Sequence, residues 1–355
     1  MRLLVVSTPV GRLGSGRGGG VELTLTNAVA GLLARGHAVT VLAGAGSQLP
    51  DDCGAAELWG ETGVDQPSWQ HQRRDAPVAL PADALLSRLW RRALAEQHHF
   101  DVLLNLAYDW LPLWLTPHSC TPLAHLVSMG SVSDAMDGVI AEIARSHPSH
   151  LAFHTAAQAA DFDLVEPPVL LGNGFDLRAY GFQANPDGLL GWAGRIAPEK
   201  GLEDAAAVAA RLGMPLAVWG LMEDAIYAAA VEAGVPAGTI QWRGFLPTAE
   251  LQAALGHCAV LLNTPKWNEA FGNVVVEAMA CGVPVAAYAR GGPGELVEEG
   301  VNGALADPDD LDALEAATRR ALAVPRVGCR GWVERYASRE VFSERLERWL
   351  LSLAG

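Results

Sequence analysis

The chain has 355 residues, 50% of them hydrophobic, and a formal net charge of −15. This length predicts about two domains, and the lack of a long basic run argues against a nucleic-acid partner, because binding to a phosphate backbone needs concentrated positive charge. The five cysteines are widely spaced, with no CxxC pair. This spacing argues against a metal or disulfide framework and favours a reducing, cytoplasmic location. The longest apolar stretch, 102–115, is interrupted by polar residues and proline, so we expect no transmembrane segment.

Short apolar runs alternate with longer helical patterns rich in alanine and leucine. In the first half we expect strands at 3–7, 38–43, 102–106, 123–128 and 151–154, and helices near 21–35, 83–97 and 133–145. In the second half we expect strands at 189–193, 216–219, 240–243, 260–263 and 285–288, and helices at 202–212, 224–233, 248–255, 274–280 and 311–323. This alternation predicts parallel sheets covered by helices on both faces.

Prolines and glycines between 166 and 188 mark a domain linker. We therefore expect an α/β protein with two doubly wound, Rossmann-like domains at 1–168 and 169–335. A C-terminal helix at 336–355 would follow, with room to cross back to the first domain. Two such domains facing each other would leave a central cleft at the carboxyl ends of both sheets, which is where such folds bind ligands.

The turn after the first expected strand is rich in glycine and leads into a helix near Val21. Gly14, Gly16 and Gly19 fit the GxGxxG pattern, in which the backbone and a helix N-terminus can approach an anion. A dinucleotide site also needs an acidic residue after the second strand, and the chain offers none before Asp51. We interpret the turn as a phosphate contact. The alternatives are a simple flexible turn and an NAD(P)-dependent oxidoreductase.

Two cations follow the first strand of the second half. Gly194 and Arg195 close that strand, and Lys200 and Gly201 are expected to open the next helix. Only Lys200 and Lys266 among the 25 basic residues are lysines, and both fall in this region. A compact cation at a helix N-terminus is otherwise unfavourable, so we predict that Arg195 and Lys200 converge on a diphosphate. The alternative is an arginine-biased composition with ordinary first-turn charges.

The most specific pattern runs from Glu269 to Glu277, eight positions apart. Phe271 to Asn273 mark the change from loop to helix, where backbone N–H groups can face a phosphate. Glu277, one turn inside the helix, can accept hydrogen bonds from ribose hydroxyls, and Glu269 can reach a hexose. Gly244, at another strand end, could bracket a base ring or be only a turn. Together these residues predict a site for a nucleotide-sugar.

These motifs resemble those of the retaining glycosyltransferases of family 4, which have the GT-B fold, and the resemblance covers nearly the whole chain. It is carried by the segments 173–176, 194–201, 269–277 and 291–295. It implies a catalytic set of Arg195, Lys200 and Glu269, with the cations holding the diphosphate so that no metal is needed. It also implies donor contacts from Gly19, Gly20, Gly244, Phe271, Gly272, Asn273, Val274 and Glu277.

The acceptor side is less regular. Many family members carry a histidine after a first-domain strand, and here that position falls on Ser128, while His125 is expected to pack within the strand. Segments 5–23 and 125–137 resemble the UDP-glucose:tetrahydrobiopterin glucosyltransferases within the family. This implies UDP-glucose as donor and a pterin acceptor contacted by Ser128, Asp134 and Trp110.

The sequence therefore predicts a cytoplasmic, retaining, metal-independent glucosyltransferase with no cofactor beyond its donor substrate. Its expected partners are a nucleotide-sugar and a small-molecule acceptor, and its oligomeric state is open. The alternatives are a family 4 enzyme with another sugar or a lipid acceptor, and a non-catalytic nucleotide-sugar binder.

Overall fold

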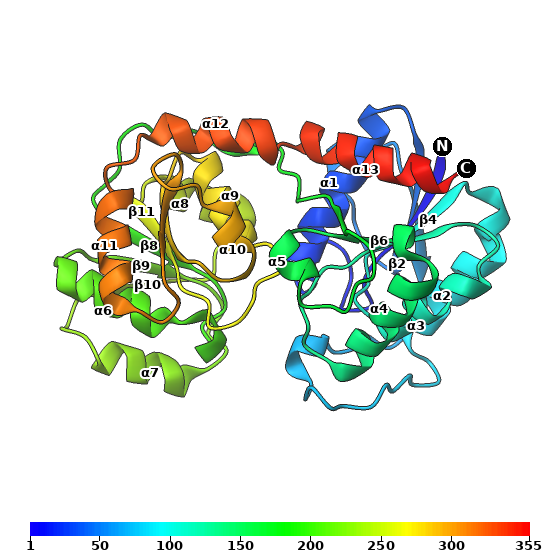
Figure 1. Cartoon of the computed structure of the whole chain (residues 1–355), viewed down its shortest axis with the longest axis horizontal. Helices are drawn as coiled ribbons and strands as arrows, with labels where there is room; N and C mark the ends of the chain where they lie inside the picture. The colour runs from blue at the N-terminus through cyan, green and yellow to red at the C-terminus, as the bar shows by residue number, and fades with distance from the viewer. The chain divides into compact units, whose positions relative to one another are not determined.

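The structure is a computed structural model that describes residues 1–355. The chain divides into two compact units, which Figure 1 colours by residue number. The first unit comprises Met1–Gly174 and Arg339–Gly355, and the second comprises Phe175–Ser338.

The first unit is built on a parallel sheet of seven strands in the order β3-β2-β1-β4-β5-β6-β7. The strands are β1 (Arg2–Val6), β2 (Ala38–Gly44), β3 (Glu57–Glu61), β4 (Val102–Asn105), β5 (Leu123–Leu126), β6 (Leu151–Phe153) and β7 (Val169–Leu170). The helices are α1 (Gly20–Ala34), α2 (Leu85–Glu96), α3 (Trp110–Trp114), α4 (Asp134–Ser146), α5 (Ala156–Ala159) and α13 (Arg339–Leu353).

Strand β1 shows why helices cover both faces of this sheet. Leu3 and Val5 pack in one core cluster with residues of α1 and α13. Leu4 and Val6, which point the other way, pack in a second cluster with residues of α2. Because successive side chains of a strand alternate between faces, a run that is apolar throughout must be buried on both sides.

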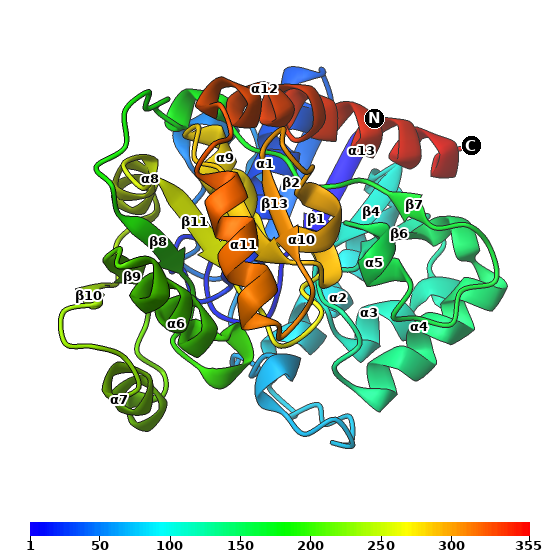
Figure 2. The same cartoon turned by 60° about the vertical axis from the view of Figure 1, so that its left-hand side comes forward.

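The second unit is built on a parallel sheet of six strands in the order β10-β9-β8-β11-β12-β13. The strands are β8 (Leu190–Ala193), β9 (Leu216–Trp219), β10 (Ile240–Gly244), β11 (Val260–Asn263), β12 (Val285–Tyr288) and β13 (Gly303–Ala306). The helices are α6 (Leu202–Leu212), α7 (Ala225–Ala233), α8 (Thr248–Gly256), α9 (Asn273–Ala280), α10 (Gly291–Leu296), α11 (Leu311–Ala321) and α12 (Arg326–Tyr336). Helices α6 and α11 lie over this sheet (Figure 2).

The predicted α/β architecture of two doubly wound sheets is confirmed. Three strands, β3, β7 and β13, were not expected from the sequence. β13 has the sequence Gly-Ala-Leu-Ala, and glycine and alanine are uncommon in strands. β3 is an edge strand with mostly exposed residues, and β7 has only two residues, so neither carries a continuous apolar run.

The unit boundaries differ from those expected. β7 pairs with β6 through Ala152 and Val169, so the first unit continues to Gly174 rather than ending at 168. The second unit ends at Ser338 rather than at 335. Helix α13 belongs to the first unit, where it packs against α1.

Candidate functional site

The strand order of the second unit reverses between β8 and β11, which are neighbours in the sheet. Ligands of doubly wound sheets bind beside the carboxyl ends of the strands at such a reversal. Arg195 follows β8 and Glu269 follows β11. Lys200 lies in the same loop as Arg195, so the fold brings all three predicted catalytic residues to the loops where a ligand is expected.

Close backbone packing ties these two loops together. Gly201 has φ +65°, and a Cβ atom there would lie 2.0 Å from the carbonyl oxygen of Thr264. The Thr264 hydroxyl donates to the Gly201 carbonyl at 2.7 Å, and the Lys266 N–H donates to the Glu199 carbonyl at 2.8 Å. Only glycine fits at position 201, so the loop carrying Lys200 is fixed against the loop after β11.

Lys200 forms an ion pair with Glu269. The two side chains are 19% and 10% exposed, so the pair is largely screened from water. The Lys200 ammonium also lies 5.1 Å from the ring centre of Trp267. Lys200 ends a 3-10 turn, Pro198–Lys200, and α6 begins only at Leu202, so the lysine precedes the helix rather than opening it.

Arg195 also has acidic partners. Its guanidinium donates to Glu223 at 2.6 Å and to Glu199 at 2.8 Å. In this structure both predicted phosphate-binding cations are therefore engaged by carboxylates of the second unit. The sequence pattern gave no indication of Glu223, because it lies after a different strand, β9.

The glycines of segment 291–295 position Glu269. Gly291 has φ +59°, and a Cβ atom there would lie 2.6 Å from both the backbone nitrogen and the carbonyl oxygen of Glu269. The Gly292 N–H donates to the Glu269 carbonyl at 2.7 Å. Gly272 is the N-cap of α9 with φ +94°, and a Cβ atom there would lie 3.0 Å from the Pro293 side chain. Small residues thus let the loop lie directly on α10.

The predicted backbone contacts lie at the start of α9. The Phe271 side chain is 6% exposed and stacks on Phe175, with ring centres 6.3 Å apart, so it belongs to the core. Asn273 and Val274 are half-buried in the first turn of α9. The dipole of a helix favours an anion at its N-terminus, and this turn is where the sequence predicts the phosphate.

Glu277 lies further along α9 and is half-buried. The Tyr180 hydroxyl lies 3.5 Å from one of its carboxylate oxygens, and Gln252 also donates to this carboxylate. Burial raises the pKa of Glu277, while these two hydrogen bonds lower it. Neutral donors thus hold Glu277 in place, whereas Glu269 has a cation as its partner. The eight-residue motif gave no sign of Tyr180, which lies far from it in the sequence.

Gly244 ends β10 with φ +70°, and its carbonyl accepts the Gly220 N–H at 3.0 Å. Beside this turn the loops after β9 and β10 expose Leu221, Met222 and Phe245, which are 53%, 50% and 61% exposed. The second unit therefore has an apolar rim at the carboxyl ends of its outer strands. The sequence pattern indicated Gly244 but not Leu221 and Met222.

The second lysine has a structural role that the sequence analysis did not foresee. Lys266 forms ion pairs with Asp204 and with Asp309, the latter at 2.9 Å. Arg290 also pairs with Asp309, and the two cations lower the pKa of that carboxyl to about 2. Lys266 thus pairs with one aspartate of α6 and with one in the loop after β13.

In the first unit the sheet order reverses between β1 and β4. The glycine-rich loop follows β1 and ends at Gly19, the N-cap of α1, and Gly20 is the first residue of that helix. The Glu22 carboxylate accepts backbone N–H groups from this loop. The predicted phosphate-contact residues are thus at the ligand-binding edge of their own sheet.

The predicted acceptor residues lie on three different elements of the first unit. Trp110 begins α3 and stacks on Trp114, with ring centres 5.6 Å apart. Ser128 follows β5, and its hydroxyl is buried without a hydrogen-bond partner. Asp134 begins α4 and pairs with Arg74 at 2.9 Å, so any contact it makes with an acceptor must compete with that arginine.

His125 packs inside β5, as expected. It is 1% exposed, and its ring lies 3.1 Å from the Asn105 amide nitrogen and 2.8 Å from the Thr116 hydroxyl. Burial lowers the pKa of His125 to about 3, so the ring is neutral at physiological pH. A neutral ring with both nitrogens engaged is a structural residue.

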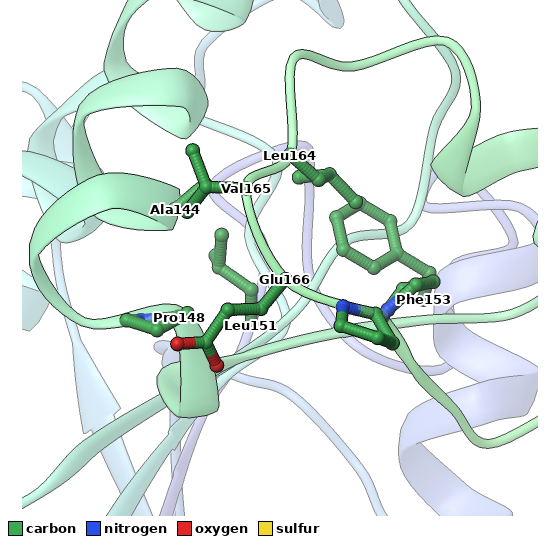
Figure 3. A pocket seen from close by; sticks show the side chains of 9 residues that line it. Ala144, Pro148, Leu151, Phe153, Leu164, Val165 and Glu166 are labelled. Atoms are coloured by element: carbon green, nitrogen blue, oxygen red, sulfur yellow. The ribbon is translucent and has the colours of Figure 1, made fainter.

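A small depression elsewhere in the first unit is apolar apart from Glu166 (Figure 3). It lies between α4, β6 and the segment 164–168, with Pro148 and Leu151 at the amino end of β6. Ligands of such sheets bind at the opposite, carboxyl end, so this depression carries no functional assignment. No cluster of three or more potential metal-binding side chains occurs in the chain, and none of its helices has the length and apolarity to span a membrane.

Residues 182–340, nearly the whole second unit, match the sequence profile of the family described as "Glycosyl transferases group 1". The D-inositol 3-phosphate glycosyltransferase of Segniliparus rotundus is 28% identical over 91% of this chain and 82% of that protein. Residues 182–340 therefore belong to the group 1 glycosyltransferase family. The glycogen synthase of Mycobacterium tuberculosis is 30% identical over 67% of this chain and 62% of that protein.

Solved structures show that the chain has the GT-B fold. Anabaena Alr3699/HepE, solved in complex with UDP, aligns with a TM-score of 0.74 at 20% identity, over 99% of this chain and 100% of that one. AviGT4, a glycosyltransferase involved in avilamycin A biosynthesis, aligns with a TM-score of 0.73 at 20% identity, over 100% and 98% of the two chains. The expected GT-B architecture is therefore confirmed.

Proposed function

We propose that this group 1 glycosyltransferase is a retaining enzyme that transfers glucose from UDP-glucose to a small acceptor. The observation that carries the proposal is the pairing of Lys200 with Glu269 where the second sheet reverses its strand order. A nucleotide-sugar presents a diphosphate, which needs cations, next to hydroxyls, which need acceptors. The ion pair of Lys200 and Glu269 places a cation for the diphosphate next to an acceptor for the sugar hydroxyls.

The donor-free geometry indicates how the donor binds. Arg195 and Lys200 are held by carboxylates, so an entering diphosphate exchanges one set of anionic partners for another. Glu269, released from Lys200, then accepts from hexose hydroxyls, and Glu277 accepts from the ribose. The first turn of α9 donates to the phosphates, and the rim beside Gly244 faces the base. Gly19 and Gly20 provide further phosphate contacts.

UDP-glucose is supported as donor because the Anabaena HepE protein has been crystallised with it.

The chemistry follows from these contacts. As the bond between the sugar C1 and the phosphate oxygen breaks, negative charge grows on the departing UDP, and Arg195 and Lys200 stabilise that charge. The acceptor hydroxyl attacks C1 from the same face, and its proton passes to the departing phosphate oxygen. One C–O bond forms as another breaks, and the configuration at C1 is retained without a protein nucleophile.

A reduced pterin is our candidate acceptor. Support comes from the resemblance of segments 5–23 and 125–137 to tetrahydrobiopterin glucosyltransferases and from the stacked Trp110 and Trp114, since flat rings stack on such faces. Mass spectrometry of products from pterin, sugar and lipid acceptors tests this choice. UDP release that no acceptor accelerates would favour a donor-binding protein without transferase activity.

Ligand-induced stabilisation tests donor binding directly. At saturating concentration UDP and UDP-glucose should raise the melting temperature, because a ligand that binds only the folded state stabilises it. GDP, ADP and NAD should have smaller effects. Replacing Glu277 by Gln should abolish most of the UDP shift, whereas Glu250→Gln, an exposed acid on α8, should leave it unchanged. A shift with NAD but not with UDP would contradict the proposal.

A further inference from the structure

The glycine-rich loop of the first unit is folded around a carboxylate of its own chain. One oxygen of Glu22 accepts the backbone N–H groups of Gly14 at 2.8 Å and of Gly16 at 3.3 Å. The other oxygen accepts the N–H of Gly18 at 2.8 Å. Three backbone donors on alternate residues thus converge on one side chain.

This arrangement determines which N–H groups remain available. The Gly19 N–H donates to the Gly16 carbonyl within the loop. The N–H groups of Gly20 and Val21 begin α1 and have no acceptor in the protein, as is usual in the first turn of a helix. Glu22 therefore takes up the donors of the loop and leaves those of the helix start for a ligand.

Other contacts show that Glu22 fits this place closely. Gly18 leaves so little room that a Cβ atom there would lie 2.8 Å from the Glu22 Cγ. Glu22 is half-buried in the first turn of α1, where the helix dipole favours a negative charge. Arg17 is tied separately to Asp65 at 2.8 Å, so the loop is held at a second point that does not involve Glu22.

We propose that Glu22 is a positioning residue that folds the loop 14–18 and thereby presents the Gly20 and Val21 N–H groups to the donor phosphate. This inference rests on the proposed function, which assigns Gly19 and Gly20 to donor binding. Without Glu22, a loop with four glycines between 14 and 19 would have to be ordered when the donor binds. Fixing the backbone of even a few residues has a substantial entropic cost.

Two measurements distinguish the role of Glu22 in ordering the loop from the proposed binding of the donor. In the donor-free protein, amide hydrogen exchange at Gly14, Gly16 and Gly18 should accelerate at least tenfold in Glu22→Ala. The same variant should weaken UDP binding roughly tenfold, because the entropic cost of ordering the loop then falls on the binding step. The exchange measurement needs no ligand, so it remains valid even if UDP does not bind the wild-type protein.

Three further variants sharpen the test. Glu22→Asp keeps the charge beside the helix N-terminus but is one methylene shorter, so it should behave like Glu22→Ala. Glu22→Gln keeps the length and one acceptor oxygen and should fall between the wild type and Glu22→Ala. Gly18→Ala should displace the Glu22 side chain and reproduce its loss. Glu340→Ala is the matched control, because Glu340 is an exposed acid in the first turn of α13.

The outcomes are decisive. If Glu22→Asp binds UDP like the wild type, charge alone matters and the positioning role is wrong. If Glu22→Ala binds UDP more tightly, Glu22 competes with the ligand instead of preparing its site, which also overturns the proposal. If the wild type binds no UDP but the loop amides still depend on Glu22, the proposed function fails while the role of Glu22 in folding the loop stands.

Discussion

Individual charged residues in the second unit have unequal roles that depend on their partners. Lys200 and Glu269 form an ion pair that is largely shielded from water. Lys266 pairs with two aspartates, whereas Glu277 accepts hydrogen bonds from neutral donors. The sequence pattern assigned Lys200 to a diphosphate and indicated no structural role for it. The pairing with Glu269 changes that expectation, because an unpaired, largely buried carboxylate destabilises a fold.

A charge-removal series at Lys200 should separate catalysis from stability. Lys200→Gln should lower turnover roughly 10²–10³-fold, since it removes the cation that we propose stabilises the leaving phosphate. It should also lower the free energy of unfolding of the second unit by about 1–3 kcal/mol, because Glu269 loses its partner. The double variant Lys200→Gln, Glu269→Gln should recover most of that stability and none of the activity.

Steady-state UDP release and urea unfolding measure the two effects independently. Lys266→Gln serves as the comparison, because its ammonium pairs with aspartates outside the proposed donor contacts and should affect stability more than turnover. Full activity in Lys200→Gln would rule out the diphosphate assignment.

At the scale of elements, tight turns set the position of the site. Loops after β8 and β11 approach so closely that position 201 must be glycine, and the loop before α9 lies directly on the glycines of α10. These approaches carry the functional side chains to one edge of the sheet. The elements themselves are ordinary strands and helices of a doubly wound unit.

A matched pair of glycines tests this view. Gly201 and Gly213 both have positive φ, 65° and 63°, and both flank α6. Gly213→Ala meets nothing within 4 Å and should cost only the left-handed backbone penalty of about 1–2 kcal/mol. Gly201→Ala places a methyl group 2.0 Å from the Thr264 carbonyl oxygen and should cost at least about 2 kcal/mol more.

Chemical denaturation followed by a probe of the second unit, such as Trp192 fluorescence, measures this difference. Gly201→Ala should also lose donor-induced stabilisation, while Gly213→Ala should keep it. Equal destabilisation by both substitutions would show that the approach to Thr264 does not constrain the loop.

At the scale of the whole molecule, the chain leaves the first unit at Gly174 and returns at Arg339. These two crossings adjoin a bridge between Phe175 and Ser338, where the Phe175 N–H donates to the Ala337 carbonyl at 3.0 Å. The final helix, α13, then completes the core of the first unit with Phe342, Leu346, Trp349 and Leu350. Residues from the two ends of the sequence therefore fold together.

This connectivity predicts an effect at a distance in sequence. Leu346→Ala, at a fully buried position, should destabilise the first unit by about 2–5 kcal/mol. Leu351→Ala, in the same helix but 50% exposed, should stay within about 0.5 kcal/mol of the wild type. Hydrogen exchange should show faster opening of β1 and α1 in Leu346→Ala and unchanged protection in β8 and β11. Equal loss of protection in both units would mean that they unfold as one.

Much of the fold could be predicted from the sequence, because its signals are local. Apolar runs such as 102–106 and 260–263 identified buried strands, and the helical patterns between them required parallel sheets. The edge strands β3, β7 and β13 were missed. The residues of β3 are mostly exposed, β7 has only two residues, and β13 is made mostly of glycine and alanine, which are uncommon in strands. The spacing from Glu269 to Glu277 was also a local signal and placed both acids around the start of one helix.

Partners in the tertiary structure could not be predicted in this way. The sequence contains two lysines and many acids in one region, and nothing in their spacing assigns Glu269 to Lys200 or Asp204 and Asp309 to Lys266. Similarly, the glycine-rich loop suggested an external anion, and its three N–H groups turned out to bind Glu22.

The sequence by itself thus determined the alternation of strands and helices, the glycine turns and the residues that we propose to bind a nucleotide-sugar. Only the tertiary structure decided which charges neutralise each other, because that depends on strand order. β8 and β11 are separated by two strands in the chain but are adjacent in the sheet, and this adjacency brings residues 200 and 269 into contact. The spacing of apolar residues along the chain indicates which face of a helix or strand is buried, but not which element packs against it. The neighbouring elements decide which charged side chains meet in a site.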